Sequence, residues 1–193
     1  MIRKAEQKDL EKLKILYDKV TVDRSQLGDS MYEANIQKQG FLLGTDDPYS
    51  LNEELENAYE FLVAEHDGDV VGYLVADHRP EQKFIDDEYK TWFDNNLKDF
   101  YYNSDEGMSL STIATDPQSM HKGVATELLR CLEEKLKLNN FKYLFSIVIV
   151  SPLTNTPSIV WHTKQGFKRL AMSRPRQLFG WDNHVSILFV KEL

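Results

Sequence analysis

The stretch that decides the fold covers residues 115–136, TDPQSMHKGVATELLRCLEEKL. The Asp116-Pro117 pair ends a strand, and a loop then leads into a helix that should end near Asn139. One face of this helix is marked by apolar residues at helical spacing, namely Val124, Leu128, Leu129, Leu132 and Leu136. Phosphate-binding loops usually carry several glycines, whereas this loop holds only Gly123.

The start of this helix allows two interpretations. The first backbone N–H groups of a helix have no intrahelical partner, and with the helix dipole they form an anion site. Gly123 would let a ligand approach the backbone closely, Ala125 is the next smallest choice, and His121 and Lys122 could add donors. An ordinary helix start explains the same residues, so the spacing alone leaves both interpretations open.

Other segments alternate between helical and strand patterns. Residues 1–5 form a short strand candidate, and residues 8–20 carry apolar side chains at helical spacing. A second helix should lie within residues 30–39 and stop at Gly40, and LNEELENA reads as a short helix or turn. YEFLVAEH and VVGYLVADH flank an Asp-Gly turn, which strongly indicates a β-hairpin.

The second half continues the alternation. MSLSTIAT and KYLFSIVIV are strand candidates, and the second has the pattern of a strand covered on both faces. A short helix follows, with Thr156 as the expected N-cap, Pro157 at its first position and Gly166 at its C-terminal cap. FKRLAMS and VSILFVKEL are the last strands. The order predicts one domain, residues 1–193, of α/β (α+β) class, with a mixed sheet and helices on its faces.

Residues 80–106 differ from their surroundings because they are rich in acidic and aromatic side chains. Phe84, Trp92 and Phe100 recur every eight residues, roughly two helical turns. We predict a helical insertion before the strand at residues 108–115. Its apolar face should pack on the body of the domain, although a substrate lid or a dimer contact would use the same side chains.

The composition limits the class of protein. The chain has 193 residues, 41% of them hydrophobic, and a formal net charge of −8. This charge argues against a nucleic-acid surface and weakly favours cationic partners such as amines. We expect a cytoplasmic protein without a membrane segment, because no apolar run reaches bilayer length and MIRKAEQKDLEKLK is too charged for a signal peptide. The only cysteine, Cys131, cannot form an internal disulfide.

Two motifs follow one another in the second half of the chain. The first is a strand, a turn and a long helix, with Met120, Gly123 and Ala125 in the loop and the helix start. The second contains Asn155, the small residue Ser158, the aromatic pair Trp161-His162 and Gly166-Phe167. In this order and separation the two motifs resemble the GNAT superfamily of acyl-CoA N-acyltransferases. Met120 departs from the Arg or Gln that is usual there, and His162 stands where many members carry tyrosine.

The resemblance implies a mixed, mostly antiparallel sheet with a splayed central strand, and a cleft for acetyl-CoA. In the splayed strand, backbone groups of Ile113, Ala114 and Thr115 would pair with the pantetheine arm, and one amide would stabilise the oxyanion. The diphosphate would lie on the loop amides of His121, Lys122, Gly123, Val124, Ala125 and Thr126. Asn155 and Ser158 match further cofactor-binding positions, with Asn155 bonding the pantetheine.

His162 is the expected catalytic residue, since the matched position faces the thioester sulfur. An imidazolium with a pKa near 6.5 could protonate the departing thiolate, and a neutral imidazole could orient a group or accept a proton. A hydrogen-bonded structural histidine beside Trp161 remains the alternative. The general base is not visible in the sequence; candidates are Asp105, Glu106, Glu65, Tyr73 and His78, and a water chain would also serve.

Other chemistries find little support. The five histidines, His66, His78, His121, His162 and His184, do not pair at metal-ligand spacing, so no metal is expected, and no Gly-x-Ser-x-Gly elbow is present. We therefore expect an N-acetyltransferase that moves an acetyl group from acetyl-CoA to a primary amine of a small molecule or peptide. A non-catalytic acyl-CoA-binding or interaction module on the same fold is the alternative. A homodimer is compatible with either function.

Overall fold

The computed structural model describes residues 1–44, 51–78, 89–103, 105–120, 122–178 and 180–193. The helices are α1 (Leu10–Val20), α2 (Ser30–Gln39), α3 (Leu51–Asn57), α5 (Asn95–Asn103), α6 (Val124–Leu138) and α7 (Thr156–Lys164). The strands are β1 (Ile2–Lys4), β2 (Glu60–His66), β3 (Asp69–Asp77), β4 (Tyr89–Trp92), β5 (Gly107–Thr115), β6 (Tyr143–Ser151), β7 (Lys168–Ser173), β8 (Arg176–Leu178) and β9 (Trp181–Glu192).

The strands form one mixed sheet in the order β1-β2-β3-β5-β6-β9-β7-β4, with β8 paired to β9. Among these strand pairs β5–β6 is parallel and the others are antiparallel. The expected mixed, mostly antiparallel sheet with helices on its faces is therefore confirmed. The central parallel pair arises because α6 carries the chain from the end of β5 back to the start of β6, as such a crossover requires.

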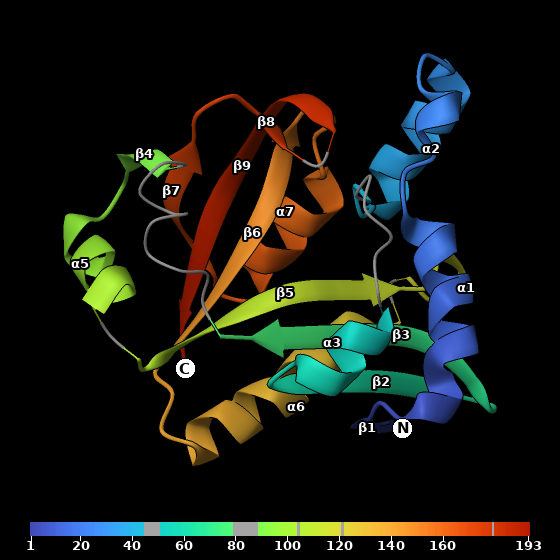
Figure 1. Ribbon diagram of the computed structural model, residues 1–193, viewed down its shortest axis with the longest axis horizontal. Coiled ribbons are helices and arrows are strands. Elements are labelled where there is room, and N and C mark those ends of the chain that lie inside the picture. The colour runs from blue at the N-terminus through green and yellow to red at the C-terminus, as the bar shows by residue number, and fades with distance from the viewer. Residues whose placement is uncertain (45–50, 79–88, 104, 121, 179) are drawn as a thin grey trace.

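The two central strands separate along their length. β5 pairs with β6 only from Gly107–Leu110 to Tyr143–Ser146, although β5 continues to Thr115 and β6 to Ser151. Figure 1 shows the two strands side by side at their starts and diverging into a V. The second half of β5 still pairs with β3 on its other side. Its edge toward β6 therefore has backbone groups without a sheet partner, as the expected splayed strand requires.

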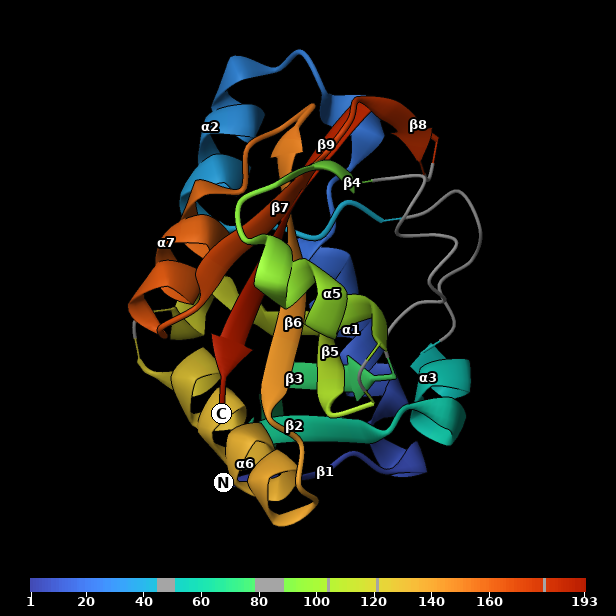
Figure 2. The same ribbon diagram turned by 90° about the vertical axis from the view of Figure 1, so that its left-hand side faces the viewer.

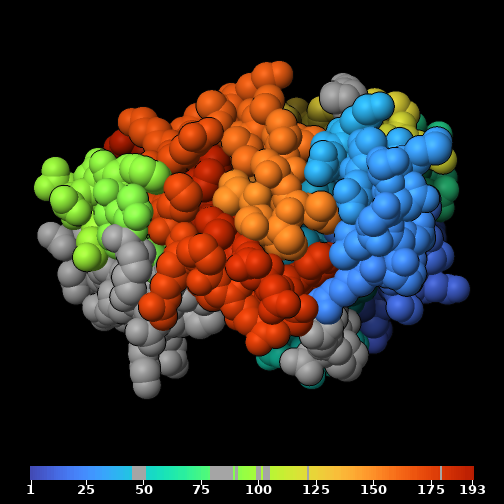
Figure 3. All heavy atoms as spheres, turned by 90° about the horizontal axis from the view of Figure 1, so that it is seen from above, coloured from blue at the N-terminus to red at the C-terminus, as the bar shows by residue number. Residues whose placement is uncertain are grey.

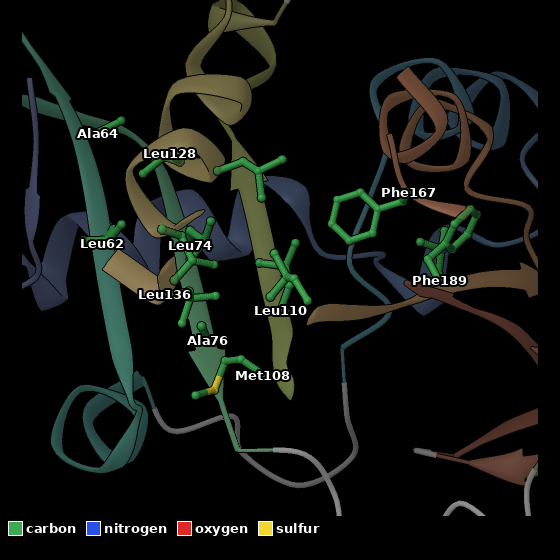
Figure 4. Packing of buried hydrophobic residues seen from close by; sticks show 14 of the residues in the cluster. Leu62, Ala64, Leu74, Ala76, Met108, Leu110, Leu128, Leu136, Phe167 and Phe189 are labelled. Atoms are coloured by element: carbon green, nitrogen blue, oxygen red, sulfur yellow. The ribbon is translucent and has the colours of Figure 1, made fainter. Parts of the chain in front are cut away.

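Helices cover both faces of the sheet (Figure 2). The amphipathic face of α6 packs on the first half of the sheet, and Figure 4 shows Leu128 and Leu136 of this helix against Leu62, Leu74 and Leu110 of β2, β3 and β5. On the opposite face, α1 and α3 bury Leu13, Leu16 and Leu51 over Phe61, Tyr73 and Val75. Apolar burial on both faces thus holds β2, β3 and β5 in place, and β5 is one of the two strands that diverge.

The predicted insertion is partly wrong in its secondary structure. Residues 89–92 form strand β4, which pairs with β7, and only residues 95–103 are helical. Trp92 therefore lies in a strand, and Phe84 lies outside the described residues, so the eight-residue spacing does not mark one helix. Two other aromatic residues of this segment, Tyr89 and Tyr101, are buried against Phe145. Aromatic and β-branched side chains in YKTW favour a strand that covers the sheet edge.

Two further expectations need correction. The N-cap of α7 is Asn155 and not Thr156, because the Asn155 carboxamide oxygen accepts a hydrogen bond from the Ser158 amide. The sixth strand is not covered on both faces throughout, since the Ile147 side chain is 40% exposed. Ile147 lies just past the last residue paired with β5, where the splay removes its neighbour. The hairpin strand β8 was not predicted.

One glycine sets how closely α6 approaches the sheet. A Cβ atom on Gly72 of β3 would lie 2.7 Å from Cγ1 of Val124 and 3.1 Å from the Ala114 carbonyl oxygen. Gly72→Ala should therefore displace the start of α6 and lower the free energy of unfolding by about 1–3 kcal/mol, the usual range for overpacking. Urea unfolding measures this, and Gly72→Ala/Val124→Ala should recover part of the loss. A single variant as stable as the wild type would contradict the close approach.

Candidate active site

The V between β5 and β6 opens into a cleft of about 940 Å³. Its walls are residues 110–115 of β5 and 146–149 of β6, together with the starts of α6 and α7 and residues 37–44, which are the end of α2 and the segment that follows it. Seen from above, the α2 segment lies beside α7 and the loop that precedes it (Figure 3). Residues from both halves of the chain thus line the cleft. They include most of the site residues predicted from the sequence.

The start of α6, where the sequence predicts a backbone cradle, presents its first residues to the cleft. Gly123, its N-cap, has a φ of +84°, and a Cβ atom there would meet no atom within 4 Å. Gly123 has no side chain to accept a hydrogen bond, and the first helical bond runs from the Glu127 amide to the Gly123 carbonyl. The amides of residues 124–126 therefore precede the first helical donor, and Gly123, Val124, Ala125 and Thr126 all line the cleft.

The surroundings hold this cradle in place. Asp116 accepts a hydrogen bond from the Gln118 amide at 2.9 Å and pairs with Lys19 of α1 at 2.8 Å. The Thr126 hydroxyl accepts bonds from Trp161 Nε1 at 3.4 Å and Gln165 Nε2 at 3.2 Å, which ties α6 to α7. Met120 lines the cleft beside the cradle. Backbone amides, fixed by neighbouring side chains, are therefore the main donors at this end.

Two loop residues fall outside this arrangement. Lys122 is exposed and lines a smaller neighbouring pocket of about 540 Å³. His121, also expected to contribute to the cradle, lies outside the described residues. In the splayed strand, Ile113, Ala114 and Thr115 all line the cleft. The structure thus brings ten of the twelve sequence-predicted site residues to one cleft, namely Ile113, Ala114, Thr115, Gly123, Val124, Ala125, Thr126, Asn155, Ser158 and His162.

Asn155 connects the cleft wall to the segment after α2. Its amide nitrogen donates to the Phe41 carbonyl oxygen at 2.8 Å, and its oxygen accepts from the Ser158 amide at 3.3 Å. The side chain is 7% exposed and lies at the cleft surface. A carboxamide has two donor hydrogens and an oxygen with two lone pairs. One hydrogen and one lone pair of Asn155 therefore remain beyond these two bonds.

His162 lies under the cleft wall with both ring nitrogens engaged. Nδ1 is 2.8 Å from the Ser158 carbonyl oxygen, which can only accept, so Nδ1 carries the proton. Nε2 is 3.0 Å from Oγ of Ser146, and this oxygen lies 3.4 Å from the Leu110 carbonyl oxygen at the base of the splay. His162 is 2% exposed. Its contacts fit the hydrogen-bonded alternative better than an acid that protonates a thiolate.

The environment keeps this imidazole neutral. Burial lowers the pKa of His162 to about 4, despite the bond to the Ser158 carbonyl, which raises it. Phe167 and Phe189 pack around the ring, with ring centroids 4.9 Å and 5.4 Å away. Stacked and edge-on aromatic rings exclude water without offering an opposite charge. At neutral pH the protonated form is therefore nearly absent.

This shift predicts a loss of stability in mild acid. The pKa of His162 is about 4 in the folded protein and about 6.5 when unfolded, so between these values the unfolded chain binds more protons. The contribution of neutral His162 to the free energy of unfolding is fully present above pH 6.5 and is lost as the pH drops toward 4. The free energy of unfolding should therefore fall by about 2 kcal/mol between pH 7 and pH 5. Urea unfolding at both values tests this. His162→Gln should show a smaller difference, and an equal difference would contradict the assignment.

The residues suggested as general base lie elsewhere. Glu65 pairs with Arg3 at 2.8 Å and Glu106 with Lys142 at 2.7 Å. The structure leaves Asp105 exposed and His78 in edge contact with Tyr59, and it buries Tyr73 completely. None of these five residues lines the cleft. These residues lie in or next to strands, but in the folded chain their side chains do not face the cleft.

The structure adds residues that the sequence did not indicate. Tyr17 of α1, Glu54 of α3, His184 of β9 and residues 37–44 complete the cleft on the side away from α6. No motif marks them, because they come from separate elements that meet only in the folded chain. Burial and the nearby Arg176 lower the pKa of His184 to about 4, so this histidine is also neutral at neutral pH.

The described part of the chain contains neither a candidate metal cluster nor a candidate membrane-spanning helix. No cluster of three or more His, Cys, Asp or Glu side chains there could hold a metal ion. None of the helices in those ranges combines the length and apolar character needed to cross a bilayer.

Comparisons with known proteins agree with this geometry. The sequence model of the acetyltransferase (GNAT) family matches residues 28–167. No curated protein sequence matches the chain. Solved structures with the same fold include the ribosomal-protein-alanine N-acetyltransferase of Brucella melitensis, at 21% identity and a TM-score of 0.58, covering 100% of this chain and 99% of that one.

Two more solved structures show the same likeness. An N-acetyltransferase of Staphylococcus aureus Mu50 has 17% identity and a TM-score of 0.59, covering 100% and 97% of the two chains. The PaiA N-acetyltransferase of Thermoplasma acidophilum, solved in complex with coenzyme A, has 16% identity and a TM-score of 0.60, covering 100% and 98%. At these identities the likeness establishes the fold.

Proposed function

The chain belongs to the GNAT acetyltransferase family of acyl-CoA-dependent enzymes, and from this premise we propose that it transfers the acetyl group of acetyl-CoA directly to a primary amine. The acceptor is a small molecule or the amine of a peptide. The observation that carries the proposal is the shared cleft, in which the uncapped start of α6 and the unpaired edge of β5 face the same space.

The cleft suits an extended anionic thioester. The diphosphate would accept hydrogen bonds from the amides of residues 123–126, where the helix dipole also favours negative charge. No carboxylate of the described residues lines this end of the cleft, and Lys164 of α7 does. The pantetheine arm would pair with the free backbone edge at residues 113–115. Asn155 and Ser158 would hold it from the opposite wall.

For the reaction, the cleft must orient the amine toward the thioester and supply one hydrogen-bond donor to the carbonyl oxygen. The amine nitrogen attacks the thioester carbonyl carbon, the C–S bond breaks, and coenzyme A leaves as a thiol after the thiolate gains a proton. A backbone amide of residues 113–115 would stabilise the charge on the carbonyl oxygen. The attacking ammonium must lose a proton first, because an amine with a pKa of about 10 is mostly protonated at neutral pH.

His162 contributes to this reaction as a positioning residue. It links Ser158 of α7 to Ser146 of β6, next to the Leu110 carbonyl where β5 and β6 separate. Through Asn155 the same set of bonds extends to Phe41. The neutral ring therefore fixes the angle of the cleft and does not protonate the thiolate, which takes its proton from solvent or from the amine.

The proposal is tested by titrating the protein with acetyl-CoA and then measuring thiol release over a panel of primary amines. We expect saturable binding and amine-dependent thiol release. Absence of acetyl-CoA binding would contradict the coenzyme site. Binding without thiol release for any amine or peptide would contradict acetyl transfer and support a binding module on the same fold.

A further inference from the structure

Apolar side chains line the cleft next to the point where β5 and β6 separate. Ile147 and Ile149 project from the same face of β6, because side chains alternate along a strand, and both line the cleft. Leu43, in the segment after α2, lines it as well. Leu43 and Ile149 pack against the same buried cluster around Phe41 and Trp181. Leu43, Ile147 and Ile149 thus form one apolar strip along the cleft.

Ile147 is the most exposed member of this apolar strip. It is 40% exposed although it lies in a central strand of the sheet, whereas Leu43 and Ile149 are half-buried. Ile147 follows Ser146, the last residue of β6 that pairs with β5. The strip therefore begins at the closed end of the V. A large apolar side chain exposed inside a concave site is a typical contact for the apolar part of a ligand.

The strip lies where the proposed function would put the reacting end of the coenzyme. With the diphosphate at the start of α6, the pantetheine arm would run along β5 from residue 115 toward residue 113, in the direction of the closed end of the V. The sulfur, and the amine that attacks the thioester, would then lie near Ile147. An acceptor in this position would place the rest of its body on the strip.

We propose that the apolar strip binds the hydrocarbon body of the acceptor, so that the preferred acceptors are primary amines with an extended apolar substituent. The inference rests on the proposed function and adds the chemical character of the group attached to the amine. Burial of each methylene contributes a similar free energy. Affinity should therefore rise with the length of the substituent until the substituent extends past the strip.

The segment that carries Leu43 is held at two points. The Asn155 amide nitrogen donates to the Phe41 carbonyl oxygen at 2.8 Å, and Asn155 is the N-cap of α7. The Leu42 amide donates to the Val20 carbonyl oxygen at 2.9 Å, at the end of α1. Asn155 is therefore a positioning residue for this side of the strip.

The test uses coenzyme A alkylated on sulfur with either a methyl or a hexyl group. A thioether cannot transfer its alkyl group to an amine, so calorimetry measures binding to the intact protein without turnover. The wild type should bind the S-hexyl form at least about tenfold more tightly than the S-methyl form. Ile147→Thr, which keeps a β-branched side chain in the strand, should reduce this ratio to within about threefold and leave the affinity for the S-methyl form unchanged.

Val160→Thr is the matched control. Val160 is 44% exposed and lines the same cleft from α7, so this change removes similar apolar surface outside the strip and should keep the wild-type ratio. Asn155→Ser keeps an oxygen that can cap α7 but is too short to reach the Phe41 carbonyl, so the ratio should fall.

Three results would overturn the proposal. They are equal affinity of the wild type for both forms, a ratio that persists in Ile147→Thr, and a ratio that is lost in Val160→Thr instead. An unchanged ratio in Asn155→Ser would contradict the positioning of Leu43 by Asn155. Failure of the S-methyl form to bind the wild type would instead contradict the proposed function.

Discussion

Gly123→Glu is expected to raise the dissociation constant of acetyl-CoA at least about a hundredfold while the protein remains folded. The new carboxylate would stand at the start of α6, where the diphosphate is to be bound. Like charges in contact repel, and the side chain would also cover the amides of residues 124–126. A hundredfold change corresponds to about 2.7 kcal/mol, which one charge repulsion and lost hydrogen bonds can readily supply.

The fold should tolerate this change. A Cβ atom at position 123 meets no other atom within 4 Å. The cost in stability therefore comes only from the left-handed φ of +84°, which is about 1–2 kcal/mol for a residue with a side chain. Gly123→Asn is the control, because asparagine adopts this conformation more readily and adds no charge. Calorimetry should show much weaker binding for Glu than for Asn. Similar affinities for both variants and the wild type would place the diphosphate elsewhere.

His162→Ala is expected to lower the free energy of unfolding by about 3–5 kcal/mol, the range for a large buried side chain whose removal leaves a cavity. The Ser158 carbonyl would lose the imidazole as a donor, and Ser146 Oγ would keep only its 3.4 Å contact with the Leu110 carbonyl oxygen. Urea unfolding at pH 7 measures the change. A loss below about 1 kcal/mol, the size of a single weak contact, would contradict the positioning role.

The same residue separates positioning from acid catalysis. His162→Gln keeps a donor and an acceptor but cannot titrate near neutral pH, so kcat should stay within about tenfold of the wild type, with the pH profile unchanged. Loss of a general acid typically costs about a hundredfold or more. A hundredfold drop in kcat in a folded His162→Gln variant, with one limb of the pH profile missing, would instead indicate that His162 acts as a general acid.

The splayed strand could be predicted because the two motifs that carry the family resemblance are local. The pattern around Gly123 alone left a phosphate site and an ordinary helix start both open, and only its combination with the second motif implied the sheet and the splay. The N-cap of α7 was placed one residue late because both Asn155 and Thr156 are good capping residues. In the folded chain it is the Asn155 side chain that accepts the hydrogen bond from the Ser158 amide.

The side of the cleft away from α6 could not be predicted in the same way. Tyr17, Glu54 and His184 line it from α1, α3 and β9, and no sequence spacing links them. Glu54 is half-buried, whereas Glu53 and Glu56 on the same helix are exposed. The role of Gly72 depends on a contact with Val124, more than fifty residues away. Such contacts depend on packing between distant elements, which leaves no periodic pattern in the sequence.

The insertion was mispredicted because its aromatic residues serve two elements. Tyr89 and Trp92 lie in β4, the edge strand that pairs with β7, while Tyr101 packs from α5 onto Phe145. A spacing of eight residues matches two helical turns but equally suits a strand followed by a helix. Periodicity over so few positions cannot distinguish these arrangements.

The central claim is that this cleft binds acetyl-CoA between the start of α6 and the splayed edge of β5. A crystal structure of the protein with acetyl-CoA tests it most directly. We expect the diphosphate oxygens within hydrogen-bond distance of the amides of residues 123–126, and the pantetheine paired with the backbone of residues 113–115. Acetyl-CoA bound outside the cleft, or in it with the diphosphate away from α6, would contradict the claim.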